Sequence, residues 1–200
     1  MYALVEDNTI TKTYNNPRGM TIGSVQYPQN IHSLWSESDL NAIGIYSVVE
    51  DNTNKRDEDW YTNTNQTLAF AGGVVTASYG TATARAIADR NGTDEDGVEL
   101  DPVVVIKGLK TAKKELFDRQ AAGYLSKYDW YIIRNTEAST AIPSAITEYR
   151  TAVRTKCNSM QAQVDGAADV DALAALFTYT ITDGVQSKPL GEWPTDPNAE

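Results

Sequence analysis

The clearest hydrophobic periodicity of the chain lies in its second half, between residues 143 and 164. Pro143 suits a first helical position, because the N–H that it lacks would have no partner there. The apolar residues that follow recur every three or four positions, as on one face of an α-helix, and they are Ile146, Tyr149, Val153, Cys157, Met160 and Val164. We therefore predict a helix from Pro143 to about Val164 with a buried stripe, in which Cys157 is a small core residue.

A second amphipathic pattern begins at Lys107. Lysines and acids occupy the positions between its apolar residues, which indicates a solvated outer face. The apolar positions recur at helical intervals at Leu109, Ala112, Leu116 and Tyr124. The sequence thus predicts two long helices in the second half.

Shorter helices are predicted from their capping residues. Ser126 with Asp129 three residues later resembles a capping box, so residues 128–137 are predicted to form a helix. We expect Trp130 to be a core anchor of that helix. Asp169 is predicted to cap another helix over residues 170–177.

Strand-type patterns dominate the first half. Two β-rich runs, 2–5 and 9–14, flank Asp7 and Asn8, which tolerate the left-handed backbone of a tight turn. Gly72 and Gly73 separate two further runs in the same way. We therefore predict two hairpins.

Between the hairpins, Ser36 and Asp39 form a second candidate capping box. It predicts one or two helical turns that end at Gly44, followed by a strand over residues 45–49.

These patterns predict an α+β protein with an N-terminal β-rich module of hairpins followed by a C-terminal antiparallel helical module. We place the β-rich attachment module at residues 1–90 and an acidic linker at 91–106. The helical module then covers residues 107–180, and an extended C-terminal tail covers 181–200, where Trp193 is a candidate docking residue.

The linker resembles part of a calcium loop, but the match fails. With Gly97 at the invariant sixth position, Gly92 and Val103 stand where carboxylate ligands are required. One histidine and one cysteine also argue against a zinc site or a histidine-based hydrolytic triad. We expect no enzyme activity, no catalytic residue, no metal and no cofactor.

The net charge of the chain argues against two classes of binding partner. A net charge of −10 and a pI near 4.6 repel both nucleic-acid phosphates and anionic membranes. No run of about 18 apolar residues is present, so we expect no membrane insertion. A single cysteine cannot form an intrachain disulfide, which fits assembly in a cytosol.

One set of residues in the helical module forms a recognisable pattern: Asp129-Trp130-Tyr131, Arg134, Glu137, Pro143, Tyr149-Arg150 and Val153-Arg154. With this pattern the module resembles the small helical domain of bacteriophage tail proteins that is known as tail-assembly-chaperone-like. Residues 1–14 and 38–46 are similar to the front halves of phage tail-fibre and tail-assembly proteins.

The resemblance implies protein–protein attachment and no active site. A pure chaperone would lack the roughly 100 additional β-rich residues and the tail with Trp193, so we favour a virion tail structural protein, fibre or baseplate/adaptor-associated. Its expected partners are other phage tail proteins and copies of itself in a symmetric assembly. Its expected location is the virion tail, after assembly in the bacterial host cytoplasm.

Two alternatives stay open. One is a tail-fibre assembly chaperone that is not retained in the virion. The other is a carbohydrate-binding host-recognition protein, suggested by aromatic residues placed in loops. The structural or interface candidates are Trp35, Trp60, Tyr61, Trp130, Arg134, Arg150 and Trp193, with the two arginines as possible partners of Asp129, Glu137 or Glu148.

Overall fold

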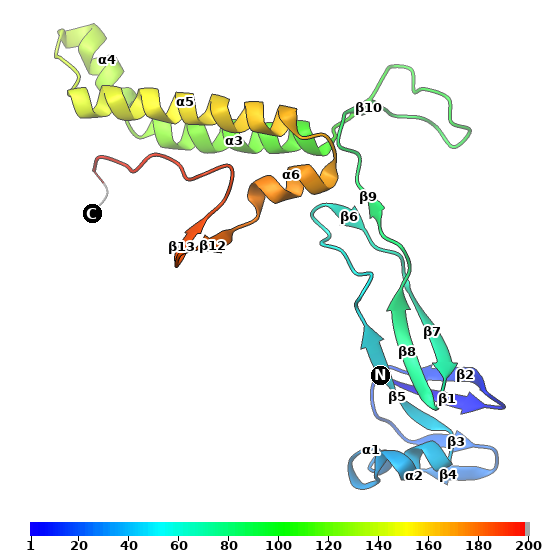
Figure 1. Ribbon diagram of the computed structural model, residues 1–200. Helices are drawn as coiled ribbons and strands as arrows, with labels where there is room; N and C mark the ends of the chain where they lie inside the picture. The colour runs from blue at the N-terminus through cyan, green and yellow to red at the C-terminus, as the bar shows by residue number, and fades with distance from the viewer. Residues whose placement is uncertain (199–200) are drawn as a thin grey trace. The chain divides into compact units, whose positions relative to one another are not determined.

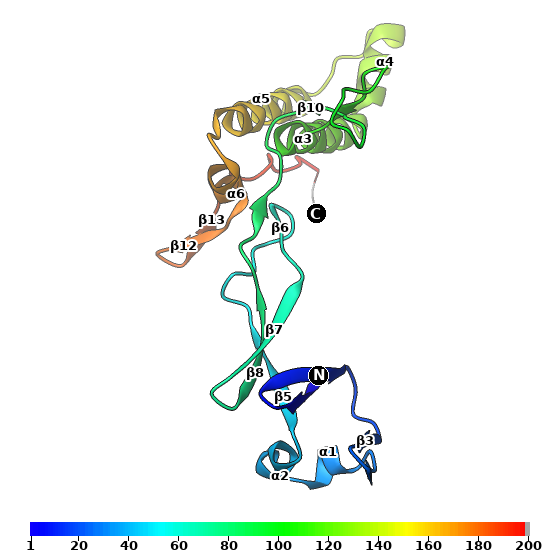
Figure 2. The same cartoon turned by 90° about the vertical axis from the view of Figure 1, so that its right-hand side faces the viewer.

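The computed structural model describes residues 1–198 (Figures 1 and 2). Its chain divides into two compact units, Met1–Thr83 and Ala84 onward. A β-rich region with a curled sheet precedes a set of helices, so the predicted α+β class is confirmed. None of the helices within these 198 residues is both long and apolar enough to cross a bilayer.

The first unit is built on one five-stranded sheet with the order β2-β1-β5-β8-β7. All neighbours are antiparallel except β5 and β8. The edge strands β2 and β7 also contact each other, which curls the sheet. The strands are β1 (Tyr2–Glu6), β2 (Thr9–Tyr14), β5 (Ile45–Asp51), β7 (Gln66–Ala71) and β8 (Val74–Tyr79).

Both predicted hairpins are confirmed. Asp7 and Asn8 take positive φ angles of 49° and 60° in the β1–β2 turn, and Gly72 and Gly73 do the same between β7 and β8. Asp and Asn are the side chains that best tolerate this region of backbone space, and glycine has no Cβ to oppose it.

The sheet has an apolar cluster on each face. Ala3, Val5 and Val75 are buried on one face. The residues that alternate with them, such as Leu4 and Ile45, join a second cluster with Tyr14, Met20, Ile31 and Leu40. The second cluster draws on β3 (Met20–Ile22), β4 (Val25–Tyr27), α1 (Ile31–Leu34) and α2 (Glu37–Ala42).

The capping box at the start of α2 is confirmed. The Ser36 hydroxyl accepts from the Asp39 N–H, and the Asp39 carboxylate accepts from the Ser36 N–H. Gly44, at φ 82°, follows the helix and leads into β5.

The second unit is organised around α3 (Leu109–Ser126) and α5 (Ser144–Gly166), which lie side by side in Figures 1 and 2. They run antiparallel, since Lys114 near the start of α3 pairs with Asp165 near the end of α5. The predicted apolar stripe of α5 is buried throughout.

Smaller elements complete the second unit. α6 (Val170–Phe177) begins at the predicted cap Asp169, whose carboxylate accepts from the Ala172 N–H. Two hairpins were not predicted, β10 (Arg90–Asn91) with β11 (Val105–Ile106), and β12 (Thr180–Thr182) with β13 (Val185–Ser187). A further two-stranded sheet pairs β6 (Tyr61–Thr62) with β9 (Thr83–Ala84), and the division of the chain into units falls within β9.

The predicted capping box of Ser126 and Asp129 is wrong. α3 continues to Ser126, whose hydroxyl donates to the Gly123 carbonyl of its own helix. Tyr128 therefore precedes α4 (Asp129–Ala138) and offers no side-chain cap.

Cys157 is a buried core residue, as predicted. Burial raises the pKa of its thiol, and the nearby Asp118 carboxylate, 3.7 Å from Sγ, acts in the same direction. The thiol is therefore kept in its protonated, weakly nucleophilic form.

Candidate interaction surfaces

The helix α4 has no buried residue, and the prediction of Trp130 as a core anchor is wrong. Trp130 is 48% exposed, and Ile132 and Ile133 are exposed as well. The core position next to α4 is taken instead by Tyr128, which is buried and meets the Tyr149 ring edge-on at 5.6 Å. Because Tyr128 already fills the core next to α4, the Trp130 indole remains exposed.

Trp130, Tyr131, Ile133 and Arg134 form what we call the α4 aromatic patch. The Arg134 guanidinium carbon lies 4.7 Å from the Trp130 ring centroid and 5.3 Å from that of Tyr131. Arg134 thus stacks on aromatic rings, a cation–π arrangement, and its predicted pairing with a carboxylate is not observed among the described residues.

Arg150 has a different role from Arg134. It is buried, and its Nη1 donates to the Leu125 carbonyl at 2.8 Å and to Asp129 Oδ1 at 2.9 Å. The predicted pairing of Arg150 with Asp129 is confirmed. These contacts tie the end of α3 and the start of α4 to α5, so this guanidinium is committed to the fold.

Replacing Trp130 with alanine is expected to change the free energy of unfolding by less than about 1 kcal/mol, because a half-exposed indole loses little burial. A buried tryptophan would cost about 3–5 kcal/mol. Urea denaturation followed by circular dichroism measures the difference. A loss in the larger range would contradict the exposed position of this side chain.

Residues 188–198 form what we call the C-terminal strap, which folds back along α3 and α5. Leu190 is buried, and its carbonyl accepts from Lys156 Nζ at 2.5 Å. The Trp193 indole N–H donates to Gln120 Oε1 at 3.2 Å, and its ring lies 5.2 Å from that of Tyr124. The predicted docking through Trp193 is therefore confirmed.

The end of the strap is also held. The Tyr128 hydroxyl donates to Asp196 Oδ1, and Lys127 Nζ lies 3.4 Å from the same carboxylate. Tyr128 and Lys127 of the same chain thus hold this end of the strap through Asp196. The last two residues, 199 and 200, lie outside the described part of the chain.

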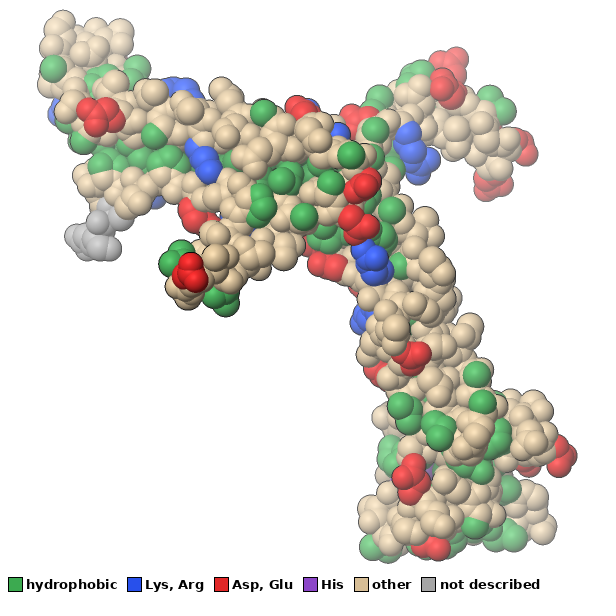
Figure 3. Space-filling model, viewed as in Figure 1, with side chains coloured by type: hydrophobic (Ala, Val, Ile, Leu, Met, Phe, Trp, Pro, Cys, Tyr) green, Lys and Arg blue, Asp and Glu red, His purple; other side chains and the backbone are tan. Residues whose placement is uncertain are grey.

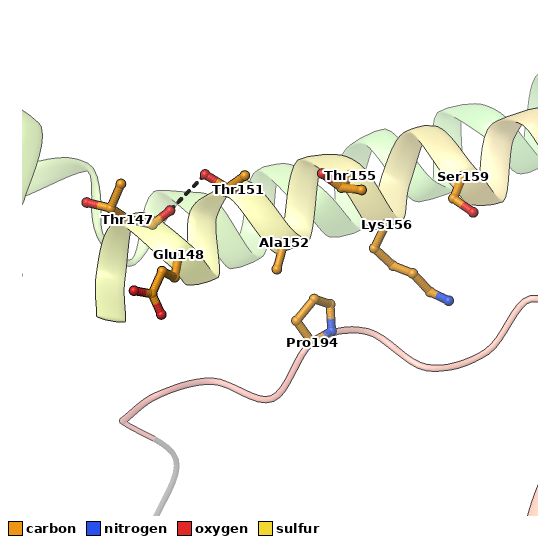
Figure 4. Close-up of a pocket in the computed structure, with 8 residues that line it drawn as sticks. All are labelled: Thr147, Glu148, Thr151, Ala152, Thr155, Lys156, Ser159 and Pro194. Carbon is orange, nitrogen blue, oxygen red and sulfur yellow. Dashed lines mark hydrogen bonds between the residues drawn. The ribbon is translucent and has the colours of Figure 1, made fainter. Parts of the chain in front are cut away.

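A pocket of about 610 Å³ lies between α5 and the strap (Figure 4). Thr147, Thr151, Thr155 and Ser159 line it at intervals of one helical turn, opposite Pro194. The Thr151 hydroxyl donates to the Thr147 carbonyl at 2.9 Å, so it is satisfied within α5. Among the lining residues, Lys156 is bound to the strap through the Leu190 carbonyl.

The strap is expected to loosen at both extremes of pH. The hydrogen bond from Tyr128 lowers the pKa of Asp196 below its ordinary 3.8, and the same bond raises the pKa of Tyr128 above 10.0. The contribution of Asp196 is present above pH 3.8 and is lost as the pH falls through its lowered pKa. The contribution of Tyr128 is present below pH 10 and is lost as the pH rises through its raised pKa.

The indole N–H signal of Trp193 in a ¹H–¹⁵N spectrum reports this loosening, and Trp193→Phe assigns the signal. Tyr128→Phe removes the bond to Asp196 and is expected to abolish the alkaline step. A Trp193 signal that moves identically in wild type and Tyr128→Phe over the whole pH range would show that this bond does not hold the strap.

The aromatic candidates of the first unit are not equivalent. Trp35 is partly exposed and meets Tyr27 edge-on at 5.9 Å. Trp60 is only 7% exposed, so its expected exposure in a loop is wrong, and it is a core residue. Tyr61 is half-buried at the start of β6, with the Arg56 guanidinium carbon 4.1 Å from its ring centroid.

Sequence reasoning missed a basic pocket in the first unit. Lys12 and Arg18 border it, and each places its cation over the buried Tyr14 ring, at 5.6 and 5.3 Å from the centroid. Met20 adds a buried apolar side chain to this pocket of about 330 Å³. Neither cation forms an ion pair with a carboxylate within residues 1–198. The signal available in the sequence was the pair of cations on either side of Tyr14.

Residues 91–106, predicted as an acidic linker, form an ordered loop that we call the acidic arm. Its backbone is hydrogen-bonded across the loop, from Gly92 N to Val104 O at 2.7 Å and from Asp94 N to Val98 O at 2.8 Å. It contains five acidic residues and no lysine or arginine. Six apolar side chains of the arm are also exposed, namely Val98, Leu100, Val103, Val104, Val105 and Ile106.

Comparisons with protein-family models, with curated proteins and with solved structures give no match for this chain. Among residues 1–198, no group of three or more histidine, cysteine or carboxylate side chains is arranged to hold a metal ion.

Proposed function

We propose that the chain is a structural protein of a bacteriophage tail that attaches to other tail proteins and to copies of itself. The resemblance of residues 129–154 to a helical domain of tail proteins supports the family. The exposed surface supports attachment as the mode of action, and the apolar side chains that it exposes are the observation that carries the proposal.

The exposed surface is apolar in several places. Besides the α4 aromatic patch and the acidic arm, the β12–β13 hairpin exposes Ile181 and Val185. An isolated two-stranded hairpin is marginally stable in water, and exposed apolar patches mark protein contacts. Assembly with partners would cover these side chains.

Mass spectrometry of purified virions, from the phage whose genome encodes the chain, tests the proposal. We expect the chain in stoichiometric amounts, as for other tail subunits. Its absence from virions, together with failure to form tails when the gene is deleted, would assign it to assembly as a chaperone instead. Specific binding on a glycan array by a virion-bound chain would favour host recognition.

A further inference from the structure

We infer that the acidic arm of one chain binds the basic pocket of a second copy, in a head-to-tail contact. This inference rests on the proposed attachment role and names one contact within it.

The pocket is prepared for an acidic and partly apolar occupant. Lys12 and Arg18 are two of the four basic residues in the unit Met1–Thr83, whose net charge is −5. Both cations lie over the Tyr14 ring, and this cation–π contact positions them without neutralising their charge. No carboxylate lines the pocket, and the buried Tyr14 and Met20 give it an apolar floor.

The arm presents the complementary chemistry. Glu95, Asp96 and Asp101 are exposed carboxylates with no side-chain partner within residues 1–198. Asp94, in contrast, accepts from the N–H groups of Asp96 and Val98 and so shapes the tip of the arm. Figure 3 shows acidic side chains gathered on this arm, with hydrophobic ones between them.

A second copy is the occupant that these features favour. Every copy carries one arm and one unpaired basic pocket, so each contact leaves a free arm at one end and a free pocket at the other. Such a heterologous contact continues into a ring if its rotation closes and into a filament if it does not. Both outcomes fit a chain that works in a symmetric assembly.

Charge reversal on the full-length chain tests the contact. The pocket variant combines Lys12→Glu with Arg18→Glu, and the arm variant combines Glu95→Lys with Asp96→Lys. Wild type is expected to self-associate in sedimentation velocity, more weakly as salt is raised. Each variant alone is expected to associate at least about tenfold more weakly, because like charges then meet.

An equimolar mixture of the two variants is the decisive sample. Acidic arms then meet wild-type pockets, and lysine-bearing arms meet glutamate-bearing pockets, so every contact between unlike chains is again attractive. We expect association to return to within a few-fold of wild type in the mixture, a pattern that a general loss of folding cannot produce.

The control variant Lys55→Glu with Arg56→Glu makes the same charge change in the same unit, away from the pocket, and is expected to associate as wild type does. Lys12→Gln with Arg18→Gln serves if the reversed pocket fails to fold, and is expected to weaken association to a smaller extent. A monomeric wild type at high concentration, or a mixture that does not recover, would overturn the contact. If the chain is abundant in virions but its self-association is unchanged in these variants, the attachment role stands and this contact is wrong.

Discussion

Leu173→Ala is expected to lower the free energy of unfolding of the helical unit by about 2–5 kcal/mol. Leu173 has no exposed surface, and it lies in α6, which packs against α5. The same helix places Phe177 on Phe117 of α3, with ring centroids 5.9 Å apart. Removing the leucine leaves a cavity where three helices meet, and rigid helices collapse into such a space only in part.

Urea unfolding followed by circular dichroism at 222 nm measures the loss, because the long helices belong to this unit. Ile181→Ala removes the same number of carbon atoms from a side chain of the same unit that is 76% exposed, and it is expected to stay within about 0.5 kcal/mol of wild type. Equal unfolding midpoints for the two variants would contradict the placement of Leu173 in the core.

The α5 helix could be predicted from sequence because its signal is long. Its 23 residues repeat the apolar spacing over about six turns, so one buried face accounts for Ile146, Val153 and Val164 together. α4 has only 10 residues, and its apolar side chains fit more than one face. The packing of Tyr128 on Tyr149 decides which side is inward, and that contact is tertiary.

The two candidate capping boxes show the same limit. Ser36 with Asp39 and Ser126 with Asp129 have identical spacing, yet only the first caps a helix. Ser126 fails because α3 continues through it, and the extent of α3 depends on its packing along α5. A four-residue pattern contains no information about that packing.

The candidate surfaces were less predictable than the fold. The acids of residues 91–106 were visible in the sequence, but the same composition fits a solvated linker and an ordered arm. The basic pocket exists because β2 and the following loop bring Lys12 and Arg18 over one ring. Convergence of this kind is a property of the folded chain.

Gly44→Ala is expected to destabilise the β-rich unit by roughly 2–5 kcal/mol, for two separable reasons. Gly44 has φ 82°, a conformation that costs an L-residue about 1–2 kcal/mol. A Cβ there would also lie 2.6 Å from the Val5 carbonyl oxygen, while Gly44 itself accepts a 2.8 Å hydrogen bond from the Val5 N–H. Relieving the clash moves β1 away from the start of β5, where Ile45 is fully buried.

Gly73→Ala separates the two causes, because Gly73 has φ 79° but open space around the position of a Cβ. It should show the conformational cost alone, about 1–2 kcal/mol. Hydrogen–deuterium exchange of β1 and β5 measures the local free energy of opening in each variant, whatever the helical unit does. Since the φ angles nearly match, any further protection lost in Gly44→Ala reports the close approach of β1. Equal losses of protection in the two variants would mean that the Val5 backbone can move away from the new Cβ at no cost in free energy. The β1–β5 contact would then be looser than the 2.8 Å bond indicates.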